Sequence, residues 1–429
     1  MPCSCRLIVS NVIPIFVLSA VYVSSSVRSE RSRRGSMSMY DAVVIGAGPA
    51  GSMAAYEIAS AGYSVLMVEK HKRPGLPMCC AEGVGRISFE KIIDPKPEWI
   101  SSRIDTVRVV APDGSDVSVA YPGAGYILER PRLDYDLAQR AVAAGCRLEC
   151  ETIGTHVDGN GDRFESIELR RPDGERVMVK AAIFIAADGI ESQIARRAGV
   201  ANAVDIEQVE SILEYRVENI DLKVDTIEFF VGNDVAPKGY LWVFPKSPNS
   251  ANIGLGIISD TKRSEEAGYR LDKFIEKNYP GAVVTHKTAG LTPKYQGKKM
   301  FRIRNLLAAG DAARALDSLT GAGIVNAMMS GKYAGEAAAE YLSDGVDGYN
   351  KLDNLYPGRF LEVKADELSL YLKLKNVYIR LKDDDFIDII KALREYFTEN
   401  STEGINTGRL LAGLIRTRPR LIRLVKYLL

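Results

Sequence analysis

The chain has 429 residues, of which 46% are hydrophobic and 26% are charged, a balance that allows a large buried core and two or three structural units. Its 56 basic and 55 acidic side chains leave a net charge of +1, which removes any global electrostatic argument for nucleic-acid binding. The six cysteines and three histidines lack the spacing of a zinc site or of an iron–sulfur cluster, so we expect no metal centre and no disulfide scaffold.

The first 38 residues differ from the rest of the chain. Residues 7–23 are mostly apolar, but this stretch is short for a membrane span and is interrupted by polar residues and a proline. The basic residues that follow it are Arg28, Arg31, Arg33 and Arg34. Three interpretations stay open: a signal peptide, a weak membrane anchor, and an extension that is not part of the mature fold. We favour the extension, because Met37 and Met39 directly precede the first predicted strand.

A glycine-rich turn opens the folded part. Residues 40–45 predict a buried strand, residues 49–61 a helix and residues 63–68 a second strand that ends in Glu69. Such a turn lets the backbone approach a pyrophosphate at the helix N-terminus, and an acid about 20 residues on accepts hydrogen bonds from the hydroxyls of a ribose. The residues of the turn expected to contact the cofactor are Gly46, Gly48, Ala50 and Gly51.

Short strands and one helix follow the second strand. Residues 103–121 predict a hairpin with its turn at 112–114, and residues 134–145 predict a helix. Residues 147–153 return to the sheet, and a second hairpin over 163–179 leads to the Asp188-Gly189 pair. Residues 204–291 are β-rich and predict an inserted sheet that covers the cofactor, with strands at 212–217, 226–231, 240–245 and 250–258.

The chain then returns to the cofactor domain. Residues 305–309 form a short apolar strand ending in Gly310-Asp311, and a second glycine-rich turn, which includes Gly323 and Ile324, precedes an alanine-rich helix. This second contact suits a ligand longer than NAD, with Asp311 on a ribityl hydroxyl and helix amides facing a flavin ring, so we expect FAD.

We therefore predict an α/β fold with a discontinuous Rossmann-like FAD-binding domain, an inserted β-sheet substrate domain and a C-terminal helical region. The expected boundaries are 1–38 for the N-terminal extension, 39–203 and 292–345 for the FAD-binding domain, 204–291 for the substrate domain and 346–429 for the helical region.

The C-terminal residues 405–429 alternate cations with leucine and isoleucine at roughly helical spacing and contain no acid after residue 405. Two interpretations are level: a terminal helix with a solvated basic face, and a helix that lies on anionic lipid. We expect a cytoplasmic protein, which the second interpretation would make peripheral on the inner face of the cell membrane.

The stretch Pro77-Met78-Cys79-Cys80-Ala81-Glu82-Gly83 resembles the P-x-x-C-[GA]-E-G signature of the geranylgeranyl reductase family. The resemblance covers the chain from about Met39 onward and implies an FAD-binding domain of the hydroxylase type, in a flavoprotein that saturates prenyl chains. Further matching stretches, in order, are Arg130 with Leu133-Asp134, Ala187-Asp188-Gly189 with Ser192, Gly239 to Pro245, and Gly310-Asp311-Ala312-Ala313. The cofactor contacts implied beyond the two glycine-rich turns are Cys80, Ala81, Gly83, Arg130 and Ile153.

Reduction of an unconjugated double bond needs a proton donor beside the hydride donor. By the resemblance, Cys80 is the first candidate to lie near that chemistry, against the alternative of a small, inert buried thiol. Glu82 is the rival donor, which would need a pKa raised by burial, and an acid that only orients the loop is an equal alternative. Arg130 would bind phosphates or fix the loop, against a solvent-exposed arginine at a helix start.

The side chains of Tyr240, Trp242 and Phe244 alternate along one predicted strand and share a face. They would line an apolar tunnel for a prenyl chain, or they form ordinary sheet core. We expect a reductase of geranylgeranyl chains in archaeal lipid precursors. The alternatives are the same reduction on another head group, an FAD-dependent monooxygenase, and a flavin electron carrier to quinone, which the missing cluster cysteines disfavour. The sequence leaves ferredoxin, NAD(P)H and other reductants open as the external electron donor.

Overall fold

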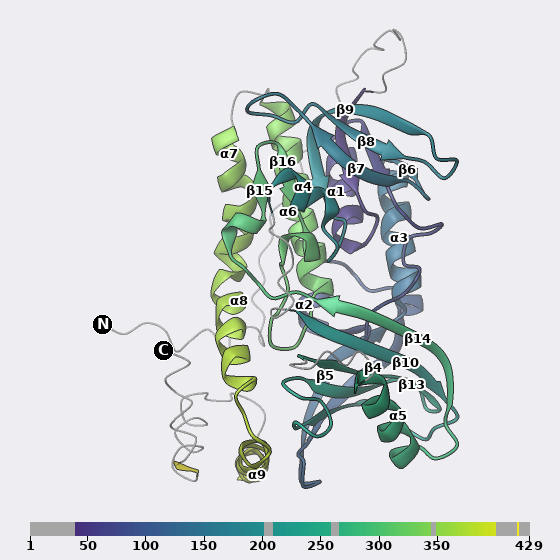
Figure 1. Ribbon diagram of the computed structural model, residues 1–429, viewed down its shortest axis with the longest axis vertical. Coiled ribbons are helices and arrows are strands. Elements are labelled where there is room, and N and C mark those ends of the chain that lie inside the picture. Colours follow the sequence, from purple (N-terminus) through teal and green to yellow (C-terminus); the bar gives the residue numbers. More distant parts are fainter. Residues whose placement is uncertain (1–38, 201–208, 259–265, 345–348, 400–417, 420–429) are drawn as a thin grey trace.

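The computed structural model describes residues 39–200, 209–258, 266–344, 349–399 and 418–419. The predictions for residues 1–38, and all but two residues of the basic 405–429 segment, lie outside these ranges. Figure 1 shows two sheets at opposite ends of the long axis, with the helix α8 running along one side from one end to the other. The expected α/β fold is confirmed in this arrangement.

The first sheet has a parallel centre that carries the glycine-rich turn. Its strand order is β15-β16-β9-β1-β2-β6, and β8 joins it antiparallel to β9 while pairing with β7. The central residues of β1 and β2 are buried almost completely, as parallel strands covered on both faces require. The strands are β1 (Met39–Ile45), β2 (Val65–Val68), β6 (Arg147–Glu149), β7 (Ile153–Asp158), β8 (Ser166–Arg170), β9 (Arg176–Ala186), β15 (Arg302–Ile303) and β16 (Leu306–Ala308).

The second sheet has the order β14-β10-β13-β12-β11-β4-β5-β3. Its strands are β3 (Gly83–Gly85), β4 (Ile100–Val110), β5 (Asp116–Leu128), β10 (Glu210–Glu218), β11 (Thr226–Val231), β12 (Tyr240–Ser247), β13 (Ser250–Ile257) and β14 (Val283–Thr292). The predicted boundary of the substrate domain is therefore wrong, because three strands from residues 83–128 belong to this sheet. Alternation identified the hairpin but not its neighbour: β4 pairs in parallel with β11, from Thr106 opposite Thr226 onward.

The described helices cover both sheets. They are α1 (Pro49–Ser60), α2 (Arg86–Glu90), α3 (Arg130–Ala143), α4 (Gln193–Ala198), α5 (Glu266–Asn278), α6 (Ile324–Ser343), α7 (Tyr349–Asp353), α8 (Arg359–Tyr378) and α9 (Asp383–Glu399). The shorter turns are Pro97–Trp99, Lys298–Met300 and Gly310–Ala313, with a π-helical turn at Asn354–Gly358. The helix predicted at 134–145 begins four residues earlier, with a proline in its first turn, where a missing amide hydrogen leaves no intrahelical bond unmade.

Helices α1 and α6 pack against each other at unusually close range. A β-carbon added to Gly331 would lie 2.1 Å from the carbonyl oxygen of Ala50, and one added to Gly335 would lie 2.6 Å from that of Ala54. The pairing advances by four residues on both helices, so the two helices run parallel. At 1.5 Å per residue, the N-terminus of α6 lies about 9 Å along this axis from that of α1. The first and the last glycine-rich turns therefore open toward the same side of the molecule.

The two faces of the second sheet differ in chemistry. Its outer face packs under α5 through an apolar cluster that includes Leu241, Ile253 and Leu271. The inner face, toward the first sheet, carries Trp242 and Phe244 packed against the signature loop at Ala81. The sequence predicted that the aromatic residues of this strand share one face, and in the structure Trp242 and Phe244 do lie together on the inner face.

Helix α8 joins the two ends of the molecule. Near its start, Phe360 belongs to the core of the first sheet, and at its end Tyr378 packs against Val231 of the second sheet. Between them, the fully buried Lys375 forms an ion pair with Glu210 of β10. The relative position of the two sheets is thus fixed by a helix that contacts both.

Candidate active site

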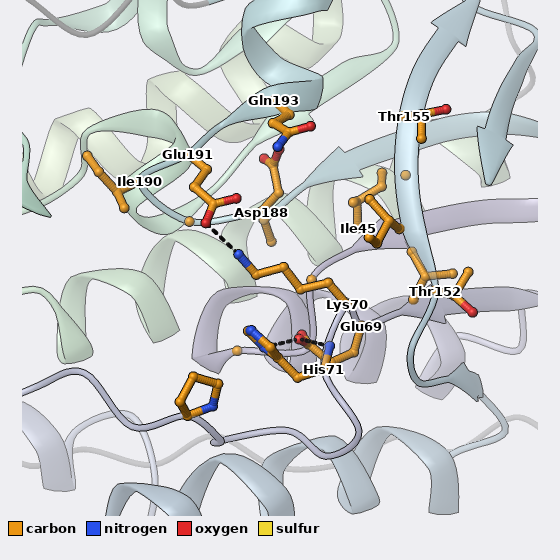
Figure 2. A pocket seen from close by; sticks show the side chains of 18 of the residues that line it. Ile45, Glu69, Lys70, His71, Thr152, Thr155, Asp188, Ile190, Glu191 and Gln193 are labelled. Atoms are coloured by element: carbon orange, nitrogen blue, oxygen red, sulfur yellow. Dashed lines mark hydrogen bonds and ion pairs between the residues drawn. The ribbon is translucent and has the colours of Figure 1, made fainter. Parts of the chain in front are cut away.

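A cavity of about 920 Å³ lies between the first glycine-rich turn and the signature loop. Figure 2 shows the part near β2 and β9, where Lys70 reaches across to Glu191 and Glu69 bonds to His71. The size lies within the range of small-molecule sites. Its lining includes several predicted cofactor contacts, together with Asp188 of the middle motif. These contacts are Gly46, Gly48, Glu69, Cys80, Arg130 and Ile153.

The glycine-rich turn leaves an open cradle at Gly48. Gly46 has φ +99°, and a β-carbon there would lie 2.2 Å from the carbonyl oxygen of Ala187. A β-carbon on Gly51 would lie 1.9 Å from the carbonyl oxygen of Gly46, so these two glycines are required for the close packing of turn, helix and strand. Around Gly48 nothing lies within 4 Å of that position. The free amides of the first turn of α1 therefore face space that a pyrophosphate fits.

Glu69 is placed as predicted at the end of β2, but it already has protein partners. Its carboxylate accepts hydrogen bonds from the amides of Ala47 at 2.9 Å and His71 at 3.0 Å, and His71 Nδ1 lies 2.8 Å from the same group. A carboxylate offers about four acceptor sites, and three donors already contact Glu69, so one site remains for a ribose hydroxyl. Glu69 thus also fixes the turn onto β2, a role that the sequence did not reveal.

Asp188 supplies an unsatisfied polar atom at the cavity wall. One carboxylate oxygen accepts the amide of Ile194 at 2.8 Å, at the start of α4, while the other, Oδ1, is buried and has no partner. Burial raises the pKa of Asp188. A buried acceptor without a donor costs free energy until a ligand donor satisfies it. The open space at Gly48 and the unpartnered Oδ1 of Asp188 together fit the FAD that the sequence predicts.

Cys80 lines the same cavity and keeps partial exposure. Burial raises the pKa of its thiol to about 11, so the sulfur carries its proton at neutral pH. The sulfur also accepts the amide hydrogen of Glu82 at 3.3 Å. Cys79 also lines this cavity, but its thiol donates to the carbonyl oxygen of Ala289 on β14. Of the two adjacent cysteines, Cys80 is the one whose sulfur accepts a bond within the signature loop.

Glu82 is buried completely and receives donors on both oxygens. Oε1 accepts the amide of Arg130 at 2.8 Å, and Oε2 accepts Lys246 Nζ at 2.6 Å. Asn252 Nδ2 at 2.9 Å and Arg216 Nη2 at 3.2 Å complete its partners. All four groups donate to Glu82, and two of them carry positive charge, so these bonds hold its side chain in place and orient the loop.

Arg130 is not a solvent-exposed residue at a helix start. Only 16% of its side chain is exposed, and it forms a two-bond ion pair with Asp134, at 2.7 and 2.8 Å. Its backbone amide holds Glu82, so Arg130 connects the signature loop to α3 and still reaches the cavity.

The residues predicted for the ring-binding half form a second group beyond the lining of this cavity. Asp311 lies in the turn after β16, where burial raises its pKa and the positive charge of Arg130 opposes that rise. A β-carbon on Gly323 would lie 3.4 Å from Asp311 Oδ1. Ile324 begins α6 and is buried. The structure thus brings Asp311, Gly323 and the N-terminus of α6 together, on the Arg130 side of the cavity.

The predicted aromatic strip is present on β12 and is largely enclosed. The ring centroids of Tyr240 and Trp242 lie 5.9 Å apart, and Phe229 of β11 packs edge-on against both Tyr240 and Phe244. Trp242 Nε1 donates to Glu214 Oε2 at 2.9 Å. Tyr240 donates through its hydroxyl to the carbonyl oxygen of Thr320, which ties the sheet to the second glycine-rich turn.

Sequence reasoning missed the buried charges around this strip. Lys246 lies two residues after Phe244 on β12, so continuing the alternation by one step would have placed its side chain on the same face as the aromatic residues. Glu214 stands in the middle of β10, directly between Leu213 and Tyr215, and a charged residue flanked by large apolar ones is itself a signal of a buried polar role.

Comparison with known proteins shows which families and folds this chain resembles. A model of the NAD(P)-binding Rossmann-like domain matches residues 44–82, and a model of the geranylgeranyl reductase catalytic domain matches residues 208–291. A solved geranylgeranyl bacteriochlorophyll reductase-like protein of Thermoplasma acidophilum superposes with a TM-score of 0.82 at 29% identity, over 92% of this chain and all of that one. A flavin-dependent brominase matches at a TM-score of 0.65 and 18% identity, over 90% of this chain and 97% of that one, and shows the fold alone.

Fold and site together define a flavin-dependent oxidoreductase with a Rossmann-like domain. Digeranylgeranylglycerophospholipid reductase of Methanosarcina acetivorans is 34% identical over 90% of this chain and 95% of its own length. The enzyme of that name from Methanosphaerula palustris is 36% identical over 89% of this chain and 96% of its own. The chain belongs to the digeranylgeranylglycerophospholipid reductase family.

Two further features bear on the site. Within the ranges that the structure describes, no helix is both long and apolar enough to cross a membrane. The same ranges hold no group of three or more histidine, cysteine or acidic side chains arranged to bind a metal ion.

Proposed function

We propose that this protein binds FAD and reduces the C=C bonds of geranylgeranyl chains in archaeal membrane-lipid precursors, converting digeranylgeranylglycerophospholipid to its saturated phytanyl form. The observation that carries this proposal is the extent of the similarity, since relatives with this activity in their name match about 90% of the chain at 34% identity. The match of residues 208–291 to the geranylgeranyl reductase catalytic domain supports the same reaction.

The chemistry explains what the protein must supply. A trisubstituted alkene has no carbonyl to accept negative charge, so hydride addition alone would create an unsupported carbanion. A bound reduced flavin supplies the hydride, and the protein must orient the chain, exclude water and hold a proton. Cys80 is the candidate donor at the cavity, because its thiol is protonated at neutral pH and lines the wall. Glu82 would position it by fixing the loop.

The prenyl chain would lie along the inner face of the second sheet. Tyr240, Trp242 and Phe244 form a continuous apolar row there, next to the signature loop at Ala81, and Tyr240 is the one of the three that stays partly exposed to a chain. The electron donor stays open between ferredoxin, NAD(P)H and another reductant. We further propose a peripheral position on the inner face of the cell membrane, supported by the basic, leucine-rich residues 405–429.

The test is an anaerobic turnover assay. The purified, dithionite-reduced protein is incubated with digeranylgeranylglyceryl phosphate, and the products are weighed by mass spectrometry. We expect a gain of two hydrogen atoms for each reduced double bond. A gain of one oxygen atom in air, with no change under anaerobic conditions, would show a monooxygenase instead. A parallel assay offers a geranylgeranyl chain on a bacteriochlorophyll-type head group. Reduction of that substrate alone would support the proposed reaction but show that the protein acts on a different head group.

A further inference from the structure

Glu214 is a buried acid on the inner face of the second sheet, in the row of residues that contains Trp242. Within that row, β10, β13 and β12 place Glu214, Gly254 and Trp242 side by side in register. A β-carbon on Gly254 would lie 2.4 Å from the indole ring, so this glycine lets the indole cross β13 and donate to Glu214 at 2.9 Å. The acid is therefore built into the aromatic strip.

The charges around Glu214 come from three elements. Glu82, in the signature loop, is a nearby negative charge, whereas Arg216 on β10 and Lys246 on β12 are positive. On the edge strand β14, the neighbours in register are Thr288, which is neutral, and the exposed His286, which pairs with Arg216. The two cations already bond to Glu82, at 3.2 and 2.6 Å. Glu214 instead bonds to a neutral indole, which leaves its charge without a dedicated cation.

These surroundings separate the roles of the two acids. Burial raises the pKa of Glu214 to about 7, with the charge of Glu82 adding to the rise. Glu214 also lies close enough to Cys80 for its negative charge to raise the pKa of that thiol. Below about pH 7, the cavity-lining thiol therefore has a protonated acid among the groups whose charge acts on it.

We propose that Glu214 stores the proton consumed in the reduction and passes it, through a bridging water, to the Cys80 thiol at the cavity. This inference rests on the proposed function. The thiol proton forms the new C–H bond at one alkene carbon while the hydride from the reduced flavin forms the other, and the carboxyl proton of Glu214 restores the thiol. The resulting carboxylate takes a proton from water. One alkene, one hydride and one proton give the saturated product.

The relay has a favourable direction. A thiolate with a pKa of about 11 takes a proton from an acid with a pKa of about 7 by roughly four powers of ten. Because Glu214 must be protonated to deliver its proton, turnover should fall as the pH rises through about 7. A relay that used Cys80 alone would lose its proton only near pH 11 and would show no such fall.

The first measurement needs no turnover. The chain has two tryptophans, so a Trp99→Phe background leaves Trp242 as the reporter of Glu214. We expect its emission to change with a single midpoint near pH 7, and to stay flat from pH 5 to 9 when Glu214→Gln is added. Glutamine keeps an acceptor oxygen for the indole but holds no titrating proton. An unchanged midpoint in that double variant would overturn the inference.

The second measurement is the rate of anaerobic alkene reduction by the pre-reduced protein. We expect Glu214→Gln to slow it by at least 100-fold without weakening substrate binding, and Glu214→Asp to recover part of the rate. Cys80→Ala should lose turnover and keep the Trp242 titration. The control is Glu218→Gln, an exposed residue at the end of the same strand. If the wild type reduces the lipid and Glu214→Gln matches that control, the proton store is wrong; if the wild type adds no hydrogen at all, the proposed function itself is wrong.

Discussion

At the scale of single residues, Glu82 holds the signature loop in place from its centre. It has φ +69°, a left-handed conformation that costs free energy for a side chain other than glycine, and its four donors offset that cost. Among them, Lys246 has a second acidic partner, Glu129, at 2.9 Å, but Glu82 is the buried one of the two. The position of Cys80 at the cavity therefore depends on a charge that never reaches the cavity itself.

We expect Glu82→Gln to destabilise the protein by about 3 kcal/mol, since it leaves the buried Lys246 with only a half-exposed partner. Equilibrium denaturation measures this change. The matched control is Glu129→Gln, which removes the exposed partner of the same lysine and should cost less than about 1 kcal/mol. Equal losses for the two variants would mean that burial of the Glu82 pair is not what stabilises the loop.

The sequence identified site residues whose contacts are local in the chain, and it missed those whose partners are distant in the chain. Glu69 and the glycines of the first turn were predictable, because strand, turn and helix are local and each position has one chemical requirement. Arg216 and Asn252 were not, since they meet Glu82 from positions 134 and 170 residues away. The environment of Glu82, and with it the balance between proton donor and loop anchor, is set by these distant partners.

At the scale of elements, the parallel crossing of α1 and α6 brings the two ends of the cofactor domain together. The alanine-rich composition of α6 predicted a helix, but the need for glycine at 331 and 335 appears only from the backbone of α1 opposite. At this crossing the backbones of α1 and α6 pack directly against each other. No flexible side chain lies between them that could move aside for a larger residue. The position of one glycine-rich turn thus fixes that of the other.

Gly331→Ala tests this crossing against helix propensity. Alanine favours an isolated helix by about 1 kcal/mol, but its β-carbon would lie 2.1 Å from the backbone of Ala50, so we expect a net loss of about 2 kcal/mol in unfolding free energy. Gly268→Ala in α5 is the control, because its β-carbon would have no neighbour closer than 4.0 Å, and it should stabilise or leave the protein unchanged. A stabilising effect of both would contradict the close packing.

The element boundaries show why alternation is only a partial guide. The strand predicted at 226–231 appears with those bounds, and 240–245 extends by two residues. The edge strand β14 was missed, because most of its residues are exposed and its pattern lacks a buried face. Sheet membership of β4 and β5 was assigned to the wrong unit, since periodicity describes a strand but not its partner.

At the scale of the whole molecule, α8 clamps the second sheet against the cofactor domain. Its Lys375 is fully buried beside Glu210, and Tyr378 donates to the carbonyl oxygen of Gly239 at 2.8 Å, just before the aromatic strip begins. Tyr240 then bonds to Thr320 of the second glycine-rich turn. The second sheet and the cofactor domain are therefore joined at both edges of the site, by the signature loop at one edge and by α8 at the other.

Replacing Lys375 with methionine should reduce the free energy of unfolding by about 3 kcal/mol, because Glu210 would keep a buried charge without a counter-ion. The double variant Lys375→Met with Glu210→Leu should recover most of that loss, since a buried ion pair replaced by apolar side chains of similar size is often neutral. Chemical denaturation of the wild type, both single variants and the double variant gives the coupling. Additive losses would show that the two residues do not form a pair in solution.

The axial offset between the parallel helices α1 and α6 gives the fold a means of selecting ligands by length. A ligand whose chain stops at one phosphate engages a single helix N-terminus, and so it loses one of two favourable interactions with the positive ends of the helix dipoles. A ligand that spans the offset of about 9 Å engages both. Because Gly331 and Gly335 hold that distance rigidly against α1, the fold favours a ligand that presents acceptor groups at both helix N-termini over one that carries a single phosphate.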